Sequence, residues 1–184
     1  MAVIRMVTDR LILRKLEQRD APLYFERISS REAVAKTMLW EPHQHPDETE
    51  AVVARCVQRY VDPTFRRWAI AQKSDDTIIG VADLLRFTED HCCSFAYMIG
   101  EDFWGQGYAT EALRAIFAYG FDHLGLEKIE ADHFSDNPAS GRVMRKLGMQ
   151  HVGCTPKAYE KNGIFHDAEA YTLTKDQFIR EPKP

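Results

Sequence analysis

Hydrophobic and polar residues alternate with short periods in the first third of the chain, which predicts a strand followed by two helices. Leu11–Arg14 has the composition of a short first strand. Asp20 is expected to cap a helix that has Pro22 in its first turn and continues to Ile28. Asp47, followed by Glu50, resembles a capping box at the start of a second helix. That helix would present one apolar face, formed by Val53, Val57 and Tyr60.

The rest of the chain predicts further strands and two more helices. Three strands are expected at 68–72, 78–87 and 94–99, the first two joined by the polar turn 74–77, and another at 129–134. A long helix is expected over 108–124, with Gly125 as its stop, and a short one between Asn137 and Gly148. Two final strands within 151–173 would flank the turn 161–163.

This order of elements predicts an α+β fold on a mixed, mostly antiparallel central sheet of about seven strands, flanked by about four helices. No linker, repeat or low-complexity segment interrupts it, so residues 1–184 are expected to form a single domain.

Composition and charge narrow the class of protein. Hydrophobic residues make up 45% of the chain and charged residues 28%, which is ordinary for a soluble globular protein. A net charge of -4 argues against a nucleic-acid partner. The charged N-terminus predicts no signal peptide, and no run approaches the roughly 20 apolar residues of a membrane span. Because the four cysteines form no C-x-x-C pair, we expect reduced thiols in a cytoplasmic protein.

The segment Phe103–Ala112 is the strongest chemical signal. Gly105 and Gly107 lie one residue apart, directly before the longest predicted helix. The first N–H groups of a helix have no intrahelical partner, and the helix dipole adds positive potential, so such a turn suits a phosphate or pyrophosphate. Two glycines before a helix also occur in ordinary tight turns.

Several segments, in order and at compatible spacing, resemble the GNAT N-acetyltransferases, and among them the RimJ/RimL-like group that includes ribosomal-protein N-terminal acetyltransferases. Tyr97–Ala112 is similar to the acetyl-CoA-binding motif of the family. The other similar segments are Thr8–Arg14, Asn137–Ser140, Lys146–Met149, Gly163, Asp167 and Tyr171–Leu173.

The resemblance implies a GNAT (acyl-CoA N-acyltransferase) fold, and acetyl-CoA as co-substrate between the fourth and fifth predicted strands. Backbone groups of Met98 and Ile99 would bind the pantetheine arm, and backbone N–H groups from Gly105 to Thr110 would hold the pyrophosphate. The cofactor-binding residues implied are Met98, Ile99, Trp104, Gly105, Gln106, Gly107, Tyr108, Ala109, Thr110, Asn137 and Ser140. No metal is expected.

Asn137 and Ser140 are the residues to which the resemblance assigns catalysis. Ser140 would donate a proton to the departing CoA thiolate. Asn137 would contact the pantetheine arm, although it is also an ideal helix N-cap before Pro138. A free amine would attack the thioester directly in a ternary complex, so no covalent enzyme intermediate is needed.

The acceptor and the general base stay open at this point. An α-amino group has a pKa of about 7.8 and needs little help, whereas a lysine or polyamine amine near 10.4 needs a better base. A protein N-terminal α-amine is therefore the first choice of acceptor, with a polyamine, amino sugar or amino acid as the alternative. The candidate bases are Asp83, His133, Glu160, His166 and Asp167, of which Asp167 is favoured as a hydrogen-bond acceptor between strands.

Some residues depart from the family pattern or have open roles. Trp104 replaces the usual Arg or Gln, and Ser94 stands where many relatives have a Glu base, which leaves a non-catalytic CoA-binding module as an alternative. Met149 in place of Phe changes packing only. His43 and His45 lack a third metal ligand nearby, and Trp40 beside them is either a substrate wall or a core residue. The final strands leave an edge that is compatible with a homodimer.

Overall fold

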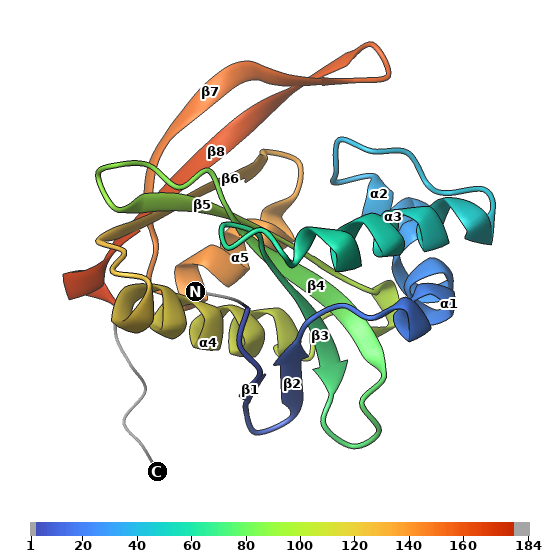
Figure 1. Cartoon of the computed structure of the whole chain (residues 1–184). Helices are drawn as coiled ribbons and strands as arrows, with labels where there is room; N and C mark the ends of the chain where they lie inside the picture. The colour runs from blue at the N-terminus through green and yellow to red at the C-terminus, as the bar shows by residue number, and fades with distance from the viewer. Residues whose placement is uncertain (1–2, 179–184) are drawn as a thin grey trace. The chain divides into compact units, whose positions relative to one another are not determined.

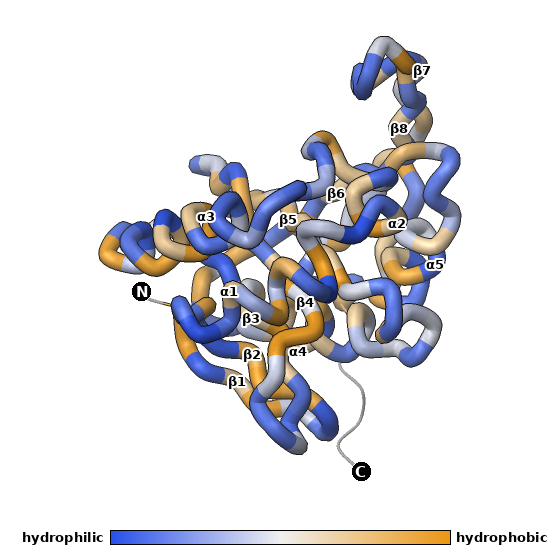
Figure 2. The backbone as a smooth tube through the Cα atoms, turned by 90° about the vertical axis from the view of Figure 1, so that its right-hand side faces the viewer, coloured by the Kyte–Doolittle hydropathy of each residue, from blue (hydrophilic) through white to orange (hydrophobic). Residues whose placement is uncertain are grey.

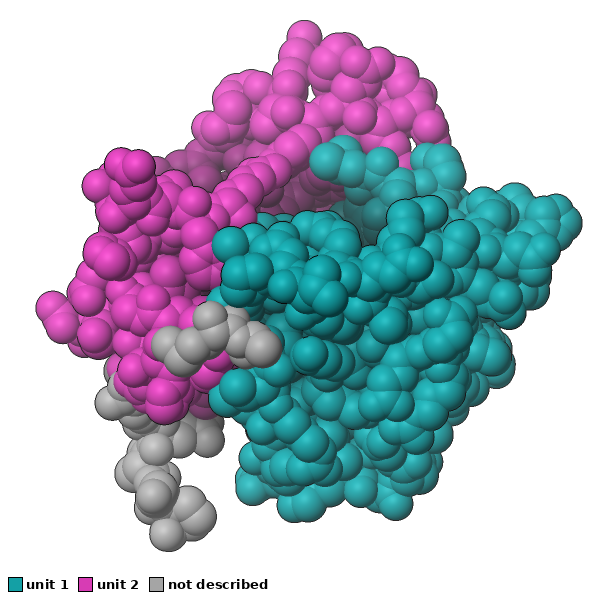
Figure 3. Space-filling view, in the orientation of Figure 1, with its two compact units in different colours: residues 1–85, 96–112 teal, residues 86–95, 113–184 magenta. Residues whose placement is uncertain are grey.

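The computed structural model describes residues 3–178, and the chain forms two compact units. Unit 1 comprises Met1–Leu85 and Ala96–Ala112, and unit 2 comprises Arg86–Phe95 and Leu113–Pro184 (Figure 3). The strand β5 (Cys92–Ile99) and the helix α4 (Tyr108–His123) each contribute residues to both units.

The sheet of unit 1 is an antiparallel meander (Figure 1). Its strands are β1 (Met6–Val7), β2 (Leu11–Arg14), β3 (Arg66–Gln72) and β4 (Ile78–Leu85), paired in that order. β5 follows β4, and the Gly100 N–H after it donates to the Ile79 carbonyl. The strands predicted here are confirmed. β1 is an additional strand, which was not predicted because two residues are too few to show a sequence pattern.

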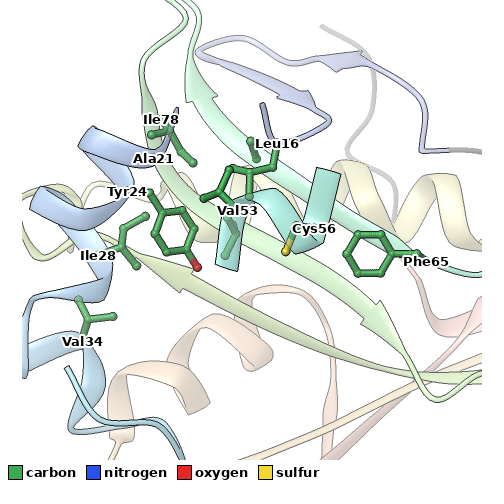
Figure 4. Close-up of a cluster of buried hydrophobic side chains, with 11 residues drawn as sticks. Leu16, Ala21, Tyr24, Ile28, Val34, Val53, Cys56, Phe65 and Ile78 are labelled. Atoms are coloured by element: carbon green, nitrogen blue, oxygen red, sulfur yellow. The ribbon is translucent and has the colours of Figure 1, made fainter. Parts of the chain in front are cut away.

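Short helical segments and one longer helix pack against this sheet. They are η1 (Gln18–Asp20), α1 (Ala21–Tyr24), the π-helical turn η2 (Phe25–Ser29), α2 (Glu32–Ala35) and α3 (Pro46–Arg59). Figure 4 shows the buried side chains between these elements, among them Tyr24, Ile28 and Val53. The expected continuous helix from Asp20 to Ile28 is therefore three consecutive short pieces, and α2 is an additional helix.

Two predicted helix caps are wrong. The Asp20 side chain does not cap α1 and instead belongs to the capping box of η1. Its carboxylate accepts two hydrogen bonds of 2.8 Å from the buried Arg14 guanidinium and one of 2.8 Å from the Glu17 N–H. The helix α3 begins at Pro46, with His45 as N-cap and Glu48 completing the capping box, rather than with Asp47 and Glu50. Proline suits the first helical position, so the helix begins at Pro46, one residue before Asp47.

In unit 2 the strand order is β5-β6-β8-β7. The strand β6 (Lys128–Phe134) pairs in parallel with β5 and antiparallel with β8 (Ile164–Thr174), which in turn pairs antiparallel with β7 (Gln150–Lys161). The hairpin of β7 and β8 extends away from the other elements of its unit and alternates between polar and apolar residues (Figure 2). These strands confirm the predicted ones, and β7 begins one residue before and β8 ends one residue after the predicted range of 151–173.

Helix α4 confirms its predicted apolar stripe, because Ile116, Phe117 and Phe121 are fully or almost fully buried. Gly125, with φ of 70°, follows its end as expected. The helix α5 (Pro138–Lys146) begins after Asn137 and is followed by Gly148 with φ of 86°. The described residues thus contain eight strands and five α-helices rather than about seven and four. None of these helices is long and apolar enough to cross a membrane.

Candidate functional site

The loop between β5 and α4 in unit 1 has the backbone shape that the two glycines predict. Gly105 and Gly107 have φ of 75° and 83°, values that residues with a Cβ rarely adopt. A Cβ at Gly105 would meet nothing within 4 Å, so this glycine is required by its backbone conformation and by what approaches it, not by crowding within the protein. The loop leads directly into the first turn of α4, whose N–H groups face outward for lack of intrahelical partners.

Side chains of the loop fix it to its own backbone. The Trp104 indole N–H donates to the Ile99 carbonyl at 2.7 Å, and the Gln106 amide donates to the Asp102 carbonyl at 3.0 Å. Trp104, which replaces the usual family residue, therefore ties the loop back to the end of β5. Nearly half of its side chain is exposed, so this hydrogen bond and not burial explains its position.

Thr8 and Arg10, more than ninety residues earlier in the chain, form hydrogen bonds with this loop and with the start of α4. Arg10 donates from Nη1 to the Gln106 carbonyl at 3.0 Å, and its guanidinium lies 4.3 Å from the centre of the Tyr108 ring. Its Nε also donates to Glu111 at 2.7 Å, and Thr8 donates to the same carboxylate at 2.6 Å. Burial raises the pKa of Glu111, but the hydrogen bonds from Thr8 and Arg10 outweigh it and lower the pKa overall. Glu111 therefore stays ionised and keeps Arg10 beside the loop.

A cavity of about 380 Å³ lies beside this arrangement in unit 1. Arg10, Lys73 and Tyr108 line it, together with Asp9, Gln72 and Ser74. Two cations next to a turn rich in free N–H groups suit a phosphorylated ligand. Arg10 and Lys73 could not be singled out for binding from the sequence, because only the pairing of β2 with β3 brings them together.

Asn137 and Ser140, the predicted catalytic residues, both lie at the N-terminus of α5 in unit 2. The Asn137 side-chain oxygen accepts from the Ser140 N–H at 3.4 Å, which confirms Asn137 as the N-cap. Ser140 is buried, with 8% of its surface exposed. The cap uses the oxygen of the Asn137 amide and leaves its NH₂ group for another acceptor.

Two of the five candidate bases have structural roles. Asp83 is buried and receives hydrogen bonds of 2.6 and 3.0 Å from Arg67, whose pKa is lowered by burial but raised further by Asp83. Asp167 accepts from the Lys157 N–H at 2.8 Å, as the expected hydrogen-bond acceptor between strands. Both carboxylates are therefore committed to partners within the protein.

The remaining three candidates lie in different surroundings within unit 2. His133 is buried and its Nδ1 donates to the Phe134 carbonyl at 2.8 Å. His166 stacks on Phe134 with ring centres 4.5 Å apart, and its Nδ1 lies 3.5 Å from an Asp136 oxygen. Glu160 is exposed near the tip of the hairpin. His166 alone among the five combines partial exposure with an acidic partner.

The loop before α3 also has a structural explanation. Trp40 is partly buried and packs against the hydrophobic cluster of unit 1, which supports its role as a core residue. His43 shares a 2.7 Å hydrogen bond with Thr49, and His45 is the N-cap of α3. All four cysteines are free thiols, three of them buried.

The predicted site residues thus fall into two groups. Met98, Ile99 and the residues from Trp104 to Thr110 belong to unit 1, where they form one continuous strand end, loop and helix start. Asn137 and Ser140 belong to unit 2, where they form the start of α5. Each group has the local conformation that its motif predicts.

Comparison with known proteins gives a consistent result. The family model described as an acetyltransferase (GNAT) domain matches residues 10–150. The chain is 30% identical to the uncharacterized N-acetyltransferase YoaA of Bacillus subtilis, over 91% of this chain and 95% of that protein. It is 26% identical to the [ribosomal protein uS5]-alanine N-acetyltransferase of Escherichia coli, over 93% of this chain and 91% of that enzyme.

A solved structure shares the fold. The spermidine N-acetyltransferase of Vibrio cholerae, crystallised with CoA and spermine, superposes with a TM-score of 0.78. The match covers 92% of this chain and 98% of that one, at 20% sequence identity. The predicted fold class is thereby confirmed.

Proposed function

Because the chain belongs to the acetyltransferase (GNAT) domain family, we propose that it acetylates the α-amine at the N-terminus of a protein. As a member of this family it is an acetyl-CoA-dependent N-acetyltransferase that transfers an acetyl group to an amine, as the sequence predicted. The relative that acts on ribosomal protein uS5 places it in the RimJ/RimL-like group. The acceptor, the site residues and the course of the reaction are the proposed part.

The amine attacks the thioester carbonyl carbon of acetyl-CoA directly. A carbon–nitrogen bond forms, the carbon–sulfur bond breaks, and the amine loses one proton while the thiolate gains one. A thiol with a pKa near 8.5 leaves readily, so a weak acid suffices to protonate it. Ser140, buried at the start of α5, would supply this proton.

The loop of unit 1 would hold the phosphates of acetyl-CoA. The backbone N–H groups from Gly105 to Thr110 would bind the pyrophosphate, and the absence of a Cβ at both glycines would allow close approach. Arg10 and Lys73 would add positive charge from the adjoining cavity. Backbone groups of Met98 and Ile99, and the free NH₂ group of Asn137, would bind the pantetheine arm.

The state of the candidate bases is the observation that carries the choice of acceptor. Asp83 and Asp167 are committed to partners within the protein, His133 is buried, and Glu160 is exposed near the hairpin tip. We therefore take His166, which is partly exposed and lies beside Asp136, as the base. At pH 7 an α-amine must give up a proton at a cost of about 1 kcal/mol, whereas a lysine or polyamine amine costs about 4.6 kcal/mol. With His166 as the base, the smaller of these two costs favours an α-amine as the acceptor.

A small polyamine is the second candidate, and one cluster in unit 2 favours it. The Tyr159 hydroxyl donates to both oxygens of Asp132, at 2.9 and 2.8 Å, and Asp136 lies beside His166. These exposed carboxylates, next to the stacked rings of Phe134 and His166, could attract a multiply charged amine. The polyamine enzyme that shares the fold shows that this scaffold accepts such substrates.

A peptide that carries both kinds of amine tests the proposal. The peptide begins with alanine and contains one internal lysine, and mass spectrometric fragmentation locates the acetyl group after incubation with acetyl-CoA. We expect acetylation at the α-amine. The matched control has the same sequence with a blocked N-terminus and should stay unmodified. Acetylation of the internal lysine in either peptide would overturn the choice of acceptor.

A further inference from the structure

A cavity of about 300 Å³ lies in unit 2 between α5 and the strands β6, β7 and β8. Its size is at the lower end of the range for small-molecule sites, about 300–1,000 Å³. His133, Gly141, Arg145, His151, Glu169 and Tyr171 contribute the polar and backbone groups that line it. None of these residues has a place in the acetyl-transfer proposal.

One nitrogen in this cavity lacks the partner that its burial requires. His133 has 9% of its surface exposed, and its Nδ1 hydrogen bonds to the Phe134 carbonyl. A carbonyl only accepts, so Nδ1 carries the proton and the neutral ring presents Nε2 as an acceptor. Within residues 3–178, Nε2 is buried and finds no hydrogen-bond partner. A buried acceptor in this state calls for a donor from a ligand or water.

Glycine at position 141 lets helix α5 lie close to this nitrogen. A Cβ on Gly141 would stand 2.8 Å from His133 Nε2 and 3.2 Å from the Tyr171 hydroxyl oxygen. Any side chain at this position would therefore collide with both groups and narrow the cavity that they line. The Tyr171 ring also stacks on His133, with ring centres 5.6 Å apart, and holds it in place.

The cavity also holds a cation without a counter-ion. Arg145 donates from Nη1 to the Tyr171 hydroxyl at 2.9 Å and forms no ion pair with the residues that the structure describes. The Tyr171 oxygen accepts this bond, so its own hydrogen is available to a second acceptor. A carboxylate is the planar anion that a guanidinium binds best among small organic groups.

An anion stands in the same cavity. Glu169 receives hydrogen bonds from Ser135 at 3.0 Å and from His151 at 2.6 Å. The bond from His151, reinforced by that from Ser135, lowers the pKa of Glu169, so its carboxylate is charged at neutral pH. The lining therefore combines one free cation, one carboxylate and one neutral acceptor.

We propose that this cavity binds a small zwitterion of the amino-acid class, with the ligand carboxylate on Arg145 and Tyr171 and its ammonium group on His133 Nε2 and Glu169. A simple anion would leave the His133 lone pair facing negative charge, and a simple amine would leave Arg145 unpaired. The site is independent of acetyl transfer, and its occupant would contact the helix that begins with Asn137 and Ser140.

Histidine ring NMR tests this site directly in the absence of acetyl-CoA. The probes are glycine, L-alanine and L-serine, with acetate and methylammonium as half-ligands, titrated into protein labelled with nitrogen-15 in its histidines. The His133 signal is assigned by its loss in His133→Phe. We expect a saturable shift of His133 Nε2 with at least one amino acid, and no comparable shift with either half-ligand.

Two arginines on the same helix provide a matched pair of variants. Both Arg142 and Arg145 are exposed on α5, but only Arg145 lines the cavity. Arg145→Met should weaken binding by about 10- to 100-fold, the effect of losing a charged hydrogen-bond partner, and Arg142→Met should not weaken it. Gly141→Ala should abolish binding, with circular dichroism to verify that the variant is folded.

Three results would overturn the proposal. Absence of a saturable shift with all three amino acids would mean that water satisfies His133. Equal binding of acetate alone would make this an anion site. Equal loss of binding in Arg142→Met and Arg145→Met would mean that the ligand does not occupy the cavity.

Discussion

The loop before α4 and the cavity beneath α5 would recognise their proposed ligands in different ways. In the loop, backbone N–H groups are exposed by two glycines with positive φ, and side chains such as Arg10 support them from outside. In the cavity, a buried imidazole, a guanidinium and a carboxylate converge from one helix and two strands. The first is a local property of about ten consecutive residues, whereas the second exists only after the sheet of unit 2 has formed.

This difference decides what each region tolerates. A site formed by backbone groups depends on a few positions where only glycine fits. Other positions in it accept varied side chains, as Trp104 in place of the family's usual Arg or Gln illustrates. A site formed by side chains depends on each of its side chains, because the removal of one leaves its buried hydrogen-bond partner unpaired. Substitutions in the two regions should therefore fail in different ways.

The largest effect is expected from the buried ion pair that supports unit 1. Asp83→Asn leaves the Arg67 guanidinium without its charged partner, which should lower the free energy of unfolding by about 3–5 kcal/mol. Urea denaturation measures this. Replacing both residues, as Arg67→Met with Asp83→Leu, should restore most of the loss. A variant of normal stability whose turnover is abolished would instead identify Asp83 as the general base.

The next largest effect is expected in the loop itself. Gly107→Val forces a β-branched residue to a φ of 83°, which costs about 1–3 kcal/mol and moves the phosphate-binding N–H groups. We expect kcat/KM for acetyl-CoA to fall by up to about 100-fold, mostly through KM. Gly125→Val, at a φ of 70° after α4, carries the same strain and should lower stability without raising this KM. Equal KM values in the two variants would contradict the assigned role of the loop.

A smaller, pH-dependent effect is expected from Glu111, which holds Arg10 beside the loop. Its pKa is lowered from 4.5 in the folded protein, so its stabilisation is complete above that pH and is lost as the pH falls through the folded pKa. Glu111→Gln should therefore be less stable than the parent by about 1.5 kcal/mol at pH 7, and this difference should shrink as the pH falls below 4.5. Thermal unfolding across this range measures the difference.

The exposed Glu127, 3.6 Å from Lys175, provides the control for this experiment. Glu127→Gln should change stability by less than about 0.5 kcal/mol across the same pH range. A pH-independent difference between Glu111→Gln and the parent would show that the carboxylate charge is not what supports Arg10.

The smallest effect is expected from substitutions that separate the capping role of Asn137 from its proposed contact with acetyl-CoA. Asn137→Asp keeps the oxygen that caps α5 but removes the NH₂ group, so stability should be preserved while KM for acetyl-CoA rises by roughly 3- to 10-fold. Asn137→Ala removes both and should also cost about 1 kcal/mol of stability. If Asn137→Asp leaves KM unchanged, Asn137 is a cap alone.

The same contrast explains how much the sequence could predict. Elements with a strong local pattern were predicted correctly, such as the apolar stripe of α4 and the Asn137 cap of α5. The role of Asp20 was predicted wrongly, because its partner Arg14 belongs to a neighbouring strand and a capping pattern contains no sign of such a pairing. Arg10 and Lys73 were missed for the same reason.

The cavity of unit 2 could not be predicted from the sequence at all. His133 was considered only as a base, because nothing near it in the sequence shows that α5 lies close to its ring at Gly141. Gly141 itself has no positive φ and lies within a helix, where a glycine usually indicates nothing about ligands. Only the packing of α5 on the sheet gives these residues a joint meaning.

A competition between acceptors tests the central claim most directly. Limiting acetyl-CoA is offered to an equimolar mixture of spermidine and a short peptide beginning with alanine, at pH 7, and both acetylated products are quantified by mass spectrometry. If the enzyme acts on protein N-termini, the acetyl group is found predominantly on the peptide α-amine. Predominant acetylation of spermidine would contradict the account and make the acidic cluster around Asp132 and Asp136 the acceptor site.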